Sequence, residues 1–338
     1  MPTRKQAVRK SSWIITSLAL TILGSVAFGQ TGINDVHVKP RHSAPDAMGA
    51  GPMPILGRSM LGVIKSEVKL VLVPVSVTDE MERLVTGLQK DNFEILEGNR
   101  PQLIQNLSSD DMPVSIGIVI DTSGSMSSKV DRLREAVTQF CKEANPQDEF
   151  FMIGFADEPY LMTDFTSSTQ DVEHDLLFAQ PKGRTALLDA IYLALHKMES
   201  ARYNRKALLV ISDGGDNHSR FTEKDVKELA KESDVMIYSI GTFDRSMPTL
   251  EEMMGPSLLA AIAEPTGGRV FTLDNLVELP SVARHIGREL RTQYVLAYHP
   301  LNPRYDGRWR KIKVKLRLPR KFAFFQAHAR SGYYAAAE

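Results

Sequence analysis

The sequence contains a single cysteine, Cys141, among 338 residues. One cysteine excludes an intramolecular disulfide framework. Cys141 stands beside Phe140 in a helical pattern, so we expect a small buried hydrophobic side chain here and not a reactive thiol.

An excess of charge of one sign is also absent, since 41 lysine and arginine residues balance 41 aspartate and glutamate residues. A protein that binds nucleic acid normally carries a basic surplus. With 43% hydrophobic and 24% charged residues, the composition is that of an ordinary globular protein. It gives no support to a general nucleic-acid binder.

Long apolar runs are scarce, and the one near the amino terminus covers residues 13–28. It is about 16 residues long, whereas a membrane-spanning helix needs about 20. Four basic residues precede it, and Ala27-Phe28-Gly29 offers the small residues of a signal-peptidase site. We therefore predict a signal peptide over residues 1–29, with an uncleaved anchor as the alternative.

Removal of residues 1–29 takes away four basic residues and no acidic one, which leaves a net charge of −4 and no membrane span. An exported chain without disulfides is more typical of a bacterial envelope protein than of a small eukaryotic secreted module. The expected location is the periplasm, the cell envelope or the medium.

The remaining chain divides by composition into four segments. Residues 30–64 are rich in proline, glycine, alanine and serine without a helical or strand period, which predicts a disordered linker. Residues 65–110 form an N-terminal β segment, 111–292 an α/β domain, and 293–338 a C-terminal β segment that packs with 65–110.

The α/β domain is predicted from apolar strands that alternate with amphipathic helical segments. This alternation indicates a doubly wound, mainly parallel sheet with helices on both faces. Thr222 is placed to cap one helix, and the last helix covers residues 276–290. The expected strands are residues 115–120, 149–155, 207–212, 235–240 and 269–272.

The flanking β segments are each too small to fold alone, so we expect them to form one small β-sandwich with the α/β domain inserted between them. Pro74 predicts an edge strand or a bulge. A hairpin is expected with strands 93–96 and 102–107, and the alternation at 311–317 indicates a half-buried antiparallel strand.

Oxygen-bearing side chains follow several predicted parallel strands, whose carboxyl ends share one edge of the sheet. They offer two carboxylates and three hydroxyls without a thiol. All-oxygen donors suit a hard cation, Mg²⁺ first, with Mn²⁺ and Ca²⁺ as alternatives. The predicted metal-site residues are Asp121, Ser123, Ser125, Thr185 and Asp213.

Rival chemistries lack their motifs. The chain has no Gly-Lys-Ser/Thr of a P-loop at "SDGGDN", and "TSGSMS" does not supply the Gly-x-Ser-x-Gly of a serine hydrolase. Haloacid dehalogenase-like phosphatases need a second aspartate two positions after the first, where this chain has Ser123. Asp216 and Asn217 are expected to stabilise their loop and not to bind metal.

The pattern Asp-x-Ser-x-Ser, then Thr, then Asp resembles the metal-ion-dependent adhesion site of the von Willebrand factor type A (VWFA) family. The resemblance covers about residues 111–292. It implies that the serine and threonine hydroxyls bind the metal directly and that Asp121 and Asp213 act largely through water. The flanks, including "ELRTQYVLAYHP" and "ARSGYY", are similar to exported bacterial VWFA-related proteins of the Acidobacteria type.

These features predict an exported, non-enzymatic binding protein that captures a carboxylate of a protein partner on the metal ion. Two alternatives stay open: an envelope scaffold without a metal-dependent ligand, and a metal-dependent hydrolase or phosphatase, which would need a general base that the sequence does not position. By the same resemblance, a shift of the last helix would transmit ligand binding to the sandwich.

Overall fold

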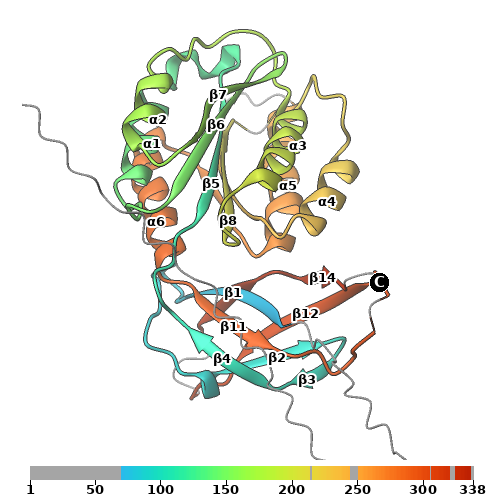
Figure 1. Ribbon diagram of the computed structural model, residues 1–338. Coiled ribbons are helices and arrows are strands. Elements are labelled where there is room, and N and C mark those ends of the chain that lie inside the picture. The colour runs from blue at the N-terminus through green and yellow to red at the C-terminus, as the bar shows by residue number, and fades with distance from the viewer. Residues whose placement is uncertain (1–69, 214, 244–249, 305, 320–323, 336–338) are drawn as a thin grey trace, which may run out of the picture. The chain divides into compact units, whose positions relative to one another are not determined.

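The computed structural model describes residues 70–213, 215–243, 250–304, 306–319 and 324–335 (Figure 1). All of them belong to one compact unit, Ile64–Glu338. The predicted signal peptide and linker lie outside the described residues.

The central element is a six-stranded sheet in which five neighbouring strands run parallel and one edge strand, β7, runs antiparallel to β6 (Figure 1). The fold is therefore of the predicted α/β class. The strands in spatial order are β10 (Val270–Leu273), β9 (Met236–Thr242), β8 (Lys206–Ser212), β5 (Ser115–Asp121), β6 (Glu149–Phe155) and β7 (Pro159–Thr166).

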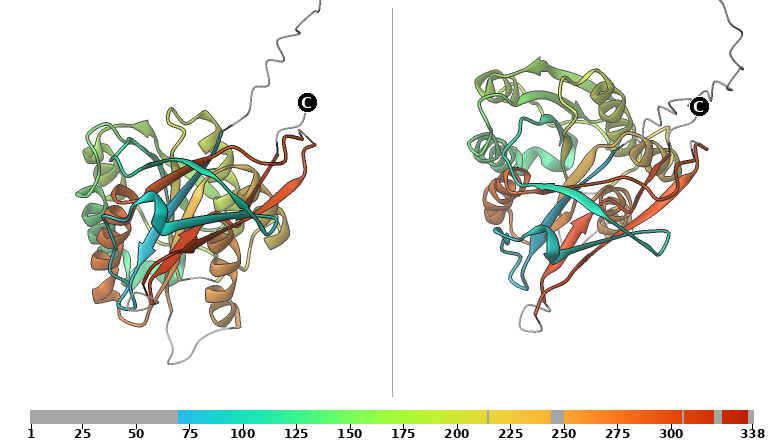
Figure 2. Two further views of the ribbon diagram at one scale, coloured as in Figure 1. Left: turned by 90° about the horizontal axis from the view of Figure 1, so that it is seen from below. Right: turned by 60° about the horizontal axis from the view of Figure 1, so that its bottom comes forward.

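Three helices cover each face of this sheet. α1 (Val130–Cys141), α2 (Thr169–Leu176) and α6 (Leu279–Arg291) share one apolar core with the strands. α3 (Leu187–Lys197), α4 (Glu223–Glu232) and α5 (Leu250–Ala263) share the other. Figure 2 shows α5 and α6 on opposite sides of the sheet. Helices thus shield both faces of the parallel strands from solvent, which explains the continuous apolar sequences of these strands.

Local sequence signals define several element ends. Thr222 caps α4 as predicted: its Oγ1 accepts the Asp225 amide at 3.3 Å, and the Asp225 carboxylate accepts the Thr222 amide at 2.9 Å. Such a reciprocal cap contributes about 1 kcal/mol. Single turns of 3₁₀ helix complete the set: η1 (Lys90–Asn92), η2 (Gly124–Ser128), η3 (Met198–Ser200), η4 (Glu264–Thr266) and η5 (Leu276–Glu278).

The chain before and after the α/β part forms two four-stranded antiparallel sheets that share a third core. Strands from both segments mix in each sheet, which makes the flanks one β-sandwich. The first has the order β13 (Gln326–Ala329), β1 (Val71–Thr78), β11 (Tyr294–Tyr298), β4 (Ile104–Ser108). The second has the order β14 (Gly332–Tyr334), β12 (Trp309–Leu316), β2 (Phe93–Glu97), β3 (Arg100–Gln102).

Two predictions in the sandwich were wrong in detail. β1 lies between two strands and is not an edge strand, yet Pro74 pairs only with Val295 of β11, because the β13 ladder begins at Val75. Proline is tolerated at position 74 because β1 has no β13 partner at this position. The second hairpin strand is interrupted at Leu103, so that β3 pairs with β2 while β4 joins the other sheet.

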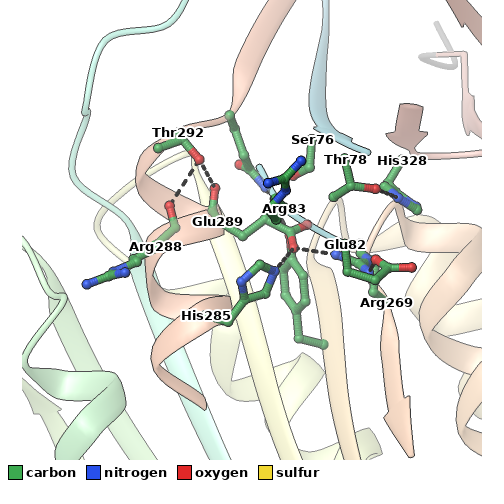
Figure 3. A network of polar contacts seen from close by, with 12 residues as sticks. Ser76, Thr78, Glu82, Arg83, Arg269, His285, Arg288, Glu289, Thr292 and His328 are labelled. Carbon is green, nitrogen blue, oxygen red and sulfur yellow. Dashed lines mark hydrogen bonds and ion pairs between the residues drawn. The ribbon is translucent and has the colours of Figure 1, made fainter. Parts of the chain in front are cut away.

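A buried polar network joins the two halves of the described chain (Figure 3). Glu289 of α6 is fully buried and accepts hydrogen bonds from Tyr238 Oη and Arg269 Nη1, both at 2.9 Å. Arg269 also forms an ion pair with Glu82, which follows β1. A buried carboxylate is tolerated when charged partners surround it in this way.

Gln293, just after α6, extends the network into the sandwich, since its Nε2 donates to Tyr238 Oη at 3.2 Å and to Ser76 Oγ at 3.5 Å. Thr78 Oγ1 and His328 Nε2 lie 3.0 Å apart beside it. We call Ser76, Glu82, Tyr238, Arg269, Glu289 and Gln293 the junction network.

Candidate metal site at the carboxyl edge of the parallel sheet

Asp121 is the last residue of β5, and its side chain is completely buried. Its Oδ1 accepts the Ser123 amide at 2.8 Å, and its Oδ2 accepts the Ser212 hydroxyl at 2.7 Å. The apolar strand thus delivers one carboxylate to the sheet edge. Hydrogen bonds from the loop after β5 and from the last residue of β8 fix its orientation.

The loop after β5 folds into η2 and presents the two serines side by side. Ser123 Oγ and Ser125 Oγ lie 3.0 Å apart, Ser123 buried and Ser125 exposed. The Gly124 amide donates to the carbonyl of Gly183 at 3.1 Å. Gly183 adopts a left-handed conformation, with φ +79°, in which a Cβ would also clash with Asp157. Glycine at this position therefore lets the loop before Thr185 approach the serine loop.

Thr185 is buried and is tied to the loop that follows Asp213. Its amide donates to Asn217 Oδ1 at 3.0 Å, and the Asn217 amide donates back to its carbonyl at 3.1 Å. Asp216 accepts hydrogen bonds from Ser219 Oγ and from the Leu188 amide. Asn217 and Asp216 thus brace the loop, the role the sequence indicated for them.

Asp213 follows β8 and is 3% exposed. The Lys129 ammonium, at the start of α1, lies 3.3 Å from Asp213 Oδ2 and 3.4 Å from the carbonyl of Thr242 at the end of β9. Lys129 therefore places a positive charge of the protein itself beside the predicted metal-site residues.

Burial, and then the negative charge of Asp213, raise the pKa of Asp121 to about 6. Hydrogen bonds from Ser123 and Ser212 act in the opposite direction. Two buried carboxylates that repel each other favour a nearby cation, because the cation lowers the electrostatic cost of both.

The five predicted residues thus occupy three adjoining loops. Asp121, Ser123 and Ser125 are linked directly, Thr185 joins them through the Gly183–Gly124 contact, and Asp213 acts on Asp121 through its charge. No direct contact joins Thr185 to the two carboxylates among the hydrogen bonds of the described chain.

The sequence did not point to Lys129 or Ser212, which contact the two carboxylates. Ser212 is a polar residue that ends an apolar strand just before Asp213, a signal that could have been used. Lys129 carries no comparable signal, because a lysine before a helix is usually solvated.

Among the described residues, no group of three or more histidine, cysteine, aspartate or glutamate side chains is placed to hold a metal ion. A cation at this edge would need the hydroxyl oxygens in addition to Asp121 and Asp213. Hydroxyls and carboxylates are ligands of Mg²⁺, Mn²⁺ and Ca²⁺, so the donor chemistry fits such an ion.

A family model described as the von Willebrand factor type A domain matches residues 116–215. The chain contains a von Willebrand factor type A domain. The matched range includes Asp121, Asp213 and the three hydroxyl residues between them. The narrower resemblance to Acidobacteria-type proteins stays a prediction.

The chain matches curated relatives over only part of their own length. Inter-alpha-trypsin inhibitor heavy chain H4 of Homo sapiens is 28% identical over 163 residues, which cover 42% of this chain and 17% of that protein. A UPF0353 protein of Mycolicibacterium paratuberculosis is 27% identical over 202 residues, which cover 52% of this chain and 60% of that protein.

Solved structures resemble the chain at lower identity. A von Willebrand factor type A protein from Catenulispora acidiphila is 12% identical with a TM-score of 0.47, covering 78% of this chain and 73% of that one. The conserved hypothetical protein BatB from Bacteroides thetaiotaomicron is 18% identical with a TM-score of 0.42, and the match covers 52% of this chain and 98% of that one. Within the described ranges, no helix has both the length and the apolar character needed to span a bilayer.

Proposed function

We propose that this protein is an exported, non-enzymatic binding protein that captures an acidic side chain of a protein partner on a divalent cation. The cation would be held by Asp121, Ser123, Ser125, Thr185 and Asp213. The observation that carries the proposal is the pair of buried carboxylates at the sheet edge, with the Lys129 ammonium held against one of them.

The donor set supports Mg²⁺ first, with Mn²⁺ and Ca²⁺ as alternatives. Two carboxylates balance a charge of +2, and the remaining donors are neutral hydroxyls. When bound, the cation would supply a Lewis-acidic centre for a carboxylate from outside the chain. The hydrogen bonds from Ser123 and Ser212 hold Asp121 in one orientation, which lowers the entropic cost of assembling the site.

A binding role also agrees with the domain type, since von Willebrand factor type A domains are generally non-enzymatic interaction modules. Export is inferred from the signal-like sequence over residues 1–29. An acidic partner group is inferred from the neutral hydroxyl donors, which leave the cation electron-poor.

Calorimetric titration with Mg²⁺ tests the cation. We expect Asp121→Asn and Ser125→Ala to weaken Mg²⁺ binding by at least about tenfold, which corresponds to about 1.4 kcal/mol. Asp216→Asn is the matched control, because Asp216 is a carboxylate of the same loop region that braces the backbone. Equal Mg²⁺ affinity in all four proteins would refute the assignment of the ligands.

Partner capture tests the binding role. The immobilised protein is exposed to envelope extract with Mg²⁺ and eluted with a chelator, with Asp121→Asn alongside. We expect a protein that elutes from the wild type alone and that a short glutamate-containing peptide also displaces. Elution that does not depend on Mg²⁺ or on Asp121 would instead support an envelope scaffold.

A further inference from the structure

A cavity of about 530 Å³ lies at the edge of the parallel sheet opposite to Asp121. Val114, just before β5, and Ala207 and Met236, at the starts of β8 and β9, line it from the α/β side. Leu72 of β1 and Trp309 of β12 line it from the sandwich. We call it the junction cavity. Its volume lies within the roughly 300–1,000 Å³ of pockets that bind small molecules, which often occur between domains.

The charges around the junction cavity are unbalanced. One lining residue is a carboxylate, Asp234, and it forms an ion pair with Arg330. Arg310 forms ion pairs with Glu97 and Asp306 and donates to the carbonyls of Asn302 and Arg304. Six lining residues are cationic: Arg205, Lys206, Lys231, Arg304, Arg310 and Arg330.

Four of these cations have no carboxylate partner within ion-pair distance in the described ranges. The Arg205 guanidinium donates to neutral acceptors only, the carbonyls of Met112 at 2.9 Å and Leu290 at 2.8 Å and Gln293 Oε1 at 3.2 Å. Lys231 lies over the ring of Trp309, 5.8 Å from its centroid. Lys206 and Arg304 are the other two cations without a carboxylate partner. Cations that line one cavity without a counter-charge favour an anion there.

Apolar side chains make up much of the remaining wall. Leu70, just before β1, and Leu72, on the outer side of β1, are 45% and 49% exposed, although both are large and apolar. The rings of Trp309 and Tyr334 pack edge to face, with 5.0 Å between their centroids. A fully solvated inorganic ion would leave these surfaces wet, whereas an apolar group would release water from them.

We propose that the junction cavity binds a small amphipathic anion, a molecule with a carboxylate or phosphate head and an alkyl or aryl body. The head is held by the unpaired cations, among them Lys206 and Lys231. The body lies against Leu72 and Trp309. This site is separate from the Asp121 edge and does not depend on a divalent cation.

Trp309 provides a local signal for the test. The chain has two tryptophans, so Trp13→Phe leaves Trp309 as the single tryptophan of the full chain, which can be excited selectively over the tyrosines. This protein is titrated with dodecanoate and with dodecyl phosphate below their micellar concentrations. Dodecyltrimethylammonium has the same body with the opposite charge, and inorganic phosphate is the head alone. We expect saturable changes in Trp309 emission with both alkyl anions and none with the other two, with calorimetry in parallel.

Variants identify the residues involved. Lys206→Gln with Lys231→Gln is expected to weaken alkyl-anion binding by roughly tenfold or more, since charge-assisted hydrogen bonds are lost. Lys224→Gln is the matched control, because Lys224 lies on the same helix α4 and its side chain is 80% exposed. Leu72→Glu places a carboxylate in the cavity and is expected to abolish binding of dodecanoate.

The proposal is overturned if the alkyl ammonium binds as tightly as the alkyl anions, or if no alkyl anion gives a saturable change. It is also overturned if the lysine variants and Leu72→Glu bind like the wild type. Circular dichroism spectra that match the wild type confirm that a loss of binding does not come from unfolding.

Discussion

Lys129 is the cation that the chain itself supplies to Asp213, and replacing it with methionine removes the charge while keeping an unbranched apolar stem. The Nζ to Oδ2 distance is 3.3 Å, with side chains 14% and 4% exposed. At an effective dielectric constant of about 20, two unit charges at this distance attract by about 5 kcal/mol. Desolvation of the two charges offsets much of this attraction. We therefore expect Lys129→Met to lower the free energy of unfolding by about 2 kcal/mol, a value between those typical of exposed and of buried ion pairs.

The same substitution should strengthen Mg²⁺ binding if the proposed site is correct. A metal ion and the Lys129 ammonium compete for Asp213, so the free energy that the pair contributes without metal opposes metal binding. Release of about 2 kcal/mol corresponds to a gain of roughly 30-fold in Mg²⁺ affinity. Lys129→Met should therefore be less stable than wild type in chelator and should gain more from Mg²⁺.

Thermal unfolding with chelator and with a Mg²⁺ series measures both effects, since a ligand that binds only the folded state raises the melting temperature with concentration. Lys142→Met is the matched control, an exposed lysine that ends the same helix. The reasoning is refuted if Lys129→Met responds to Mg²⁺ no more strongly than Lys142→Met.

Three further predictions concern stability and reactivity. Burial lowers the pKa values of both His285 and His328, and the nearby charge of Arg269 lowers them further. The charge of Glu289 acts in the opposite direction on both. For His285, the charge of Arg288 also lowers the pKa. At these two histidines the unfolded chain then binds more protons, so their contribution to stability is lost as the pH falls below about 6.5, whereas Asp121, with its pKa raised to about 6, acts in the opposite direction. In an Asp121→Asn background, urea midpoints that do not drop between about pH 7.5 and 5.5 would contradict the histidine prediction. Gly268→Ala would drive a Cβ into the backbone of Ile237, and we expect a loss of about 2 kcal/mol and a melting temperature lower by roughly 4–8 °C. Burial raises the pKa of Cys141 to about 12, so a thiol reagent should label it only after unfolding, and rapid labelling of the native protein would show that Cys141 is accessible.

The sequence predicted the parallel strands well, because strands buried on both faces are apolar throughout. β7 was not predicted: in "PYLMTDFT" exposed and buried positions mix, and the strand pairs only with β6. α5 was not delimited either, since Pro256 lies within it and obscures the helical period. The last helix begins at Leu279 after a 3₁₀ turn, three residues later than expected.

For the candidate site, the sequence identified the oxygen donors but not the side chains that orient them. Asp121 and Asp213 stand out because they end apolar strands. The contacts of Ser212 with Asp121 and of Lys129 with Asp213 span 91 and 84 residues. Contacts at such separations depend on how the strands and helices meet in space, which periodicity along one strand does not encode.

The junction network has a consequence for how this domain could be moved between proteins. Arg269 and Glu289 are buried in the α/β part, yet Arg269 shares its charge with Glu82, and Tyr238 reaches Ser76 through Gln293. A graft that ended at residue 292 would expose a buried arginine and carboxylate and leave Tyr238 without one of its partners. Recombination should therefore exchange the domain together with its flanking strands, and both halves should melt in a single cooperative transition.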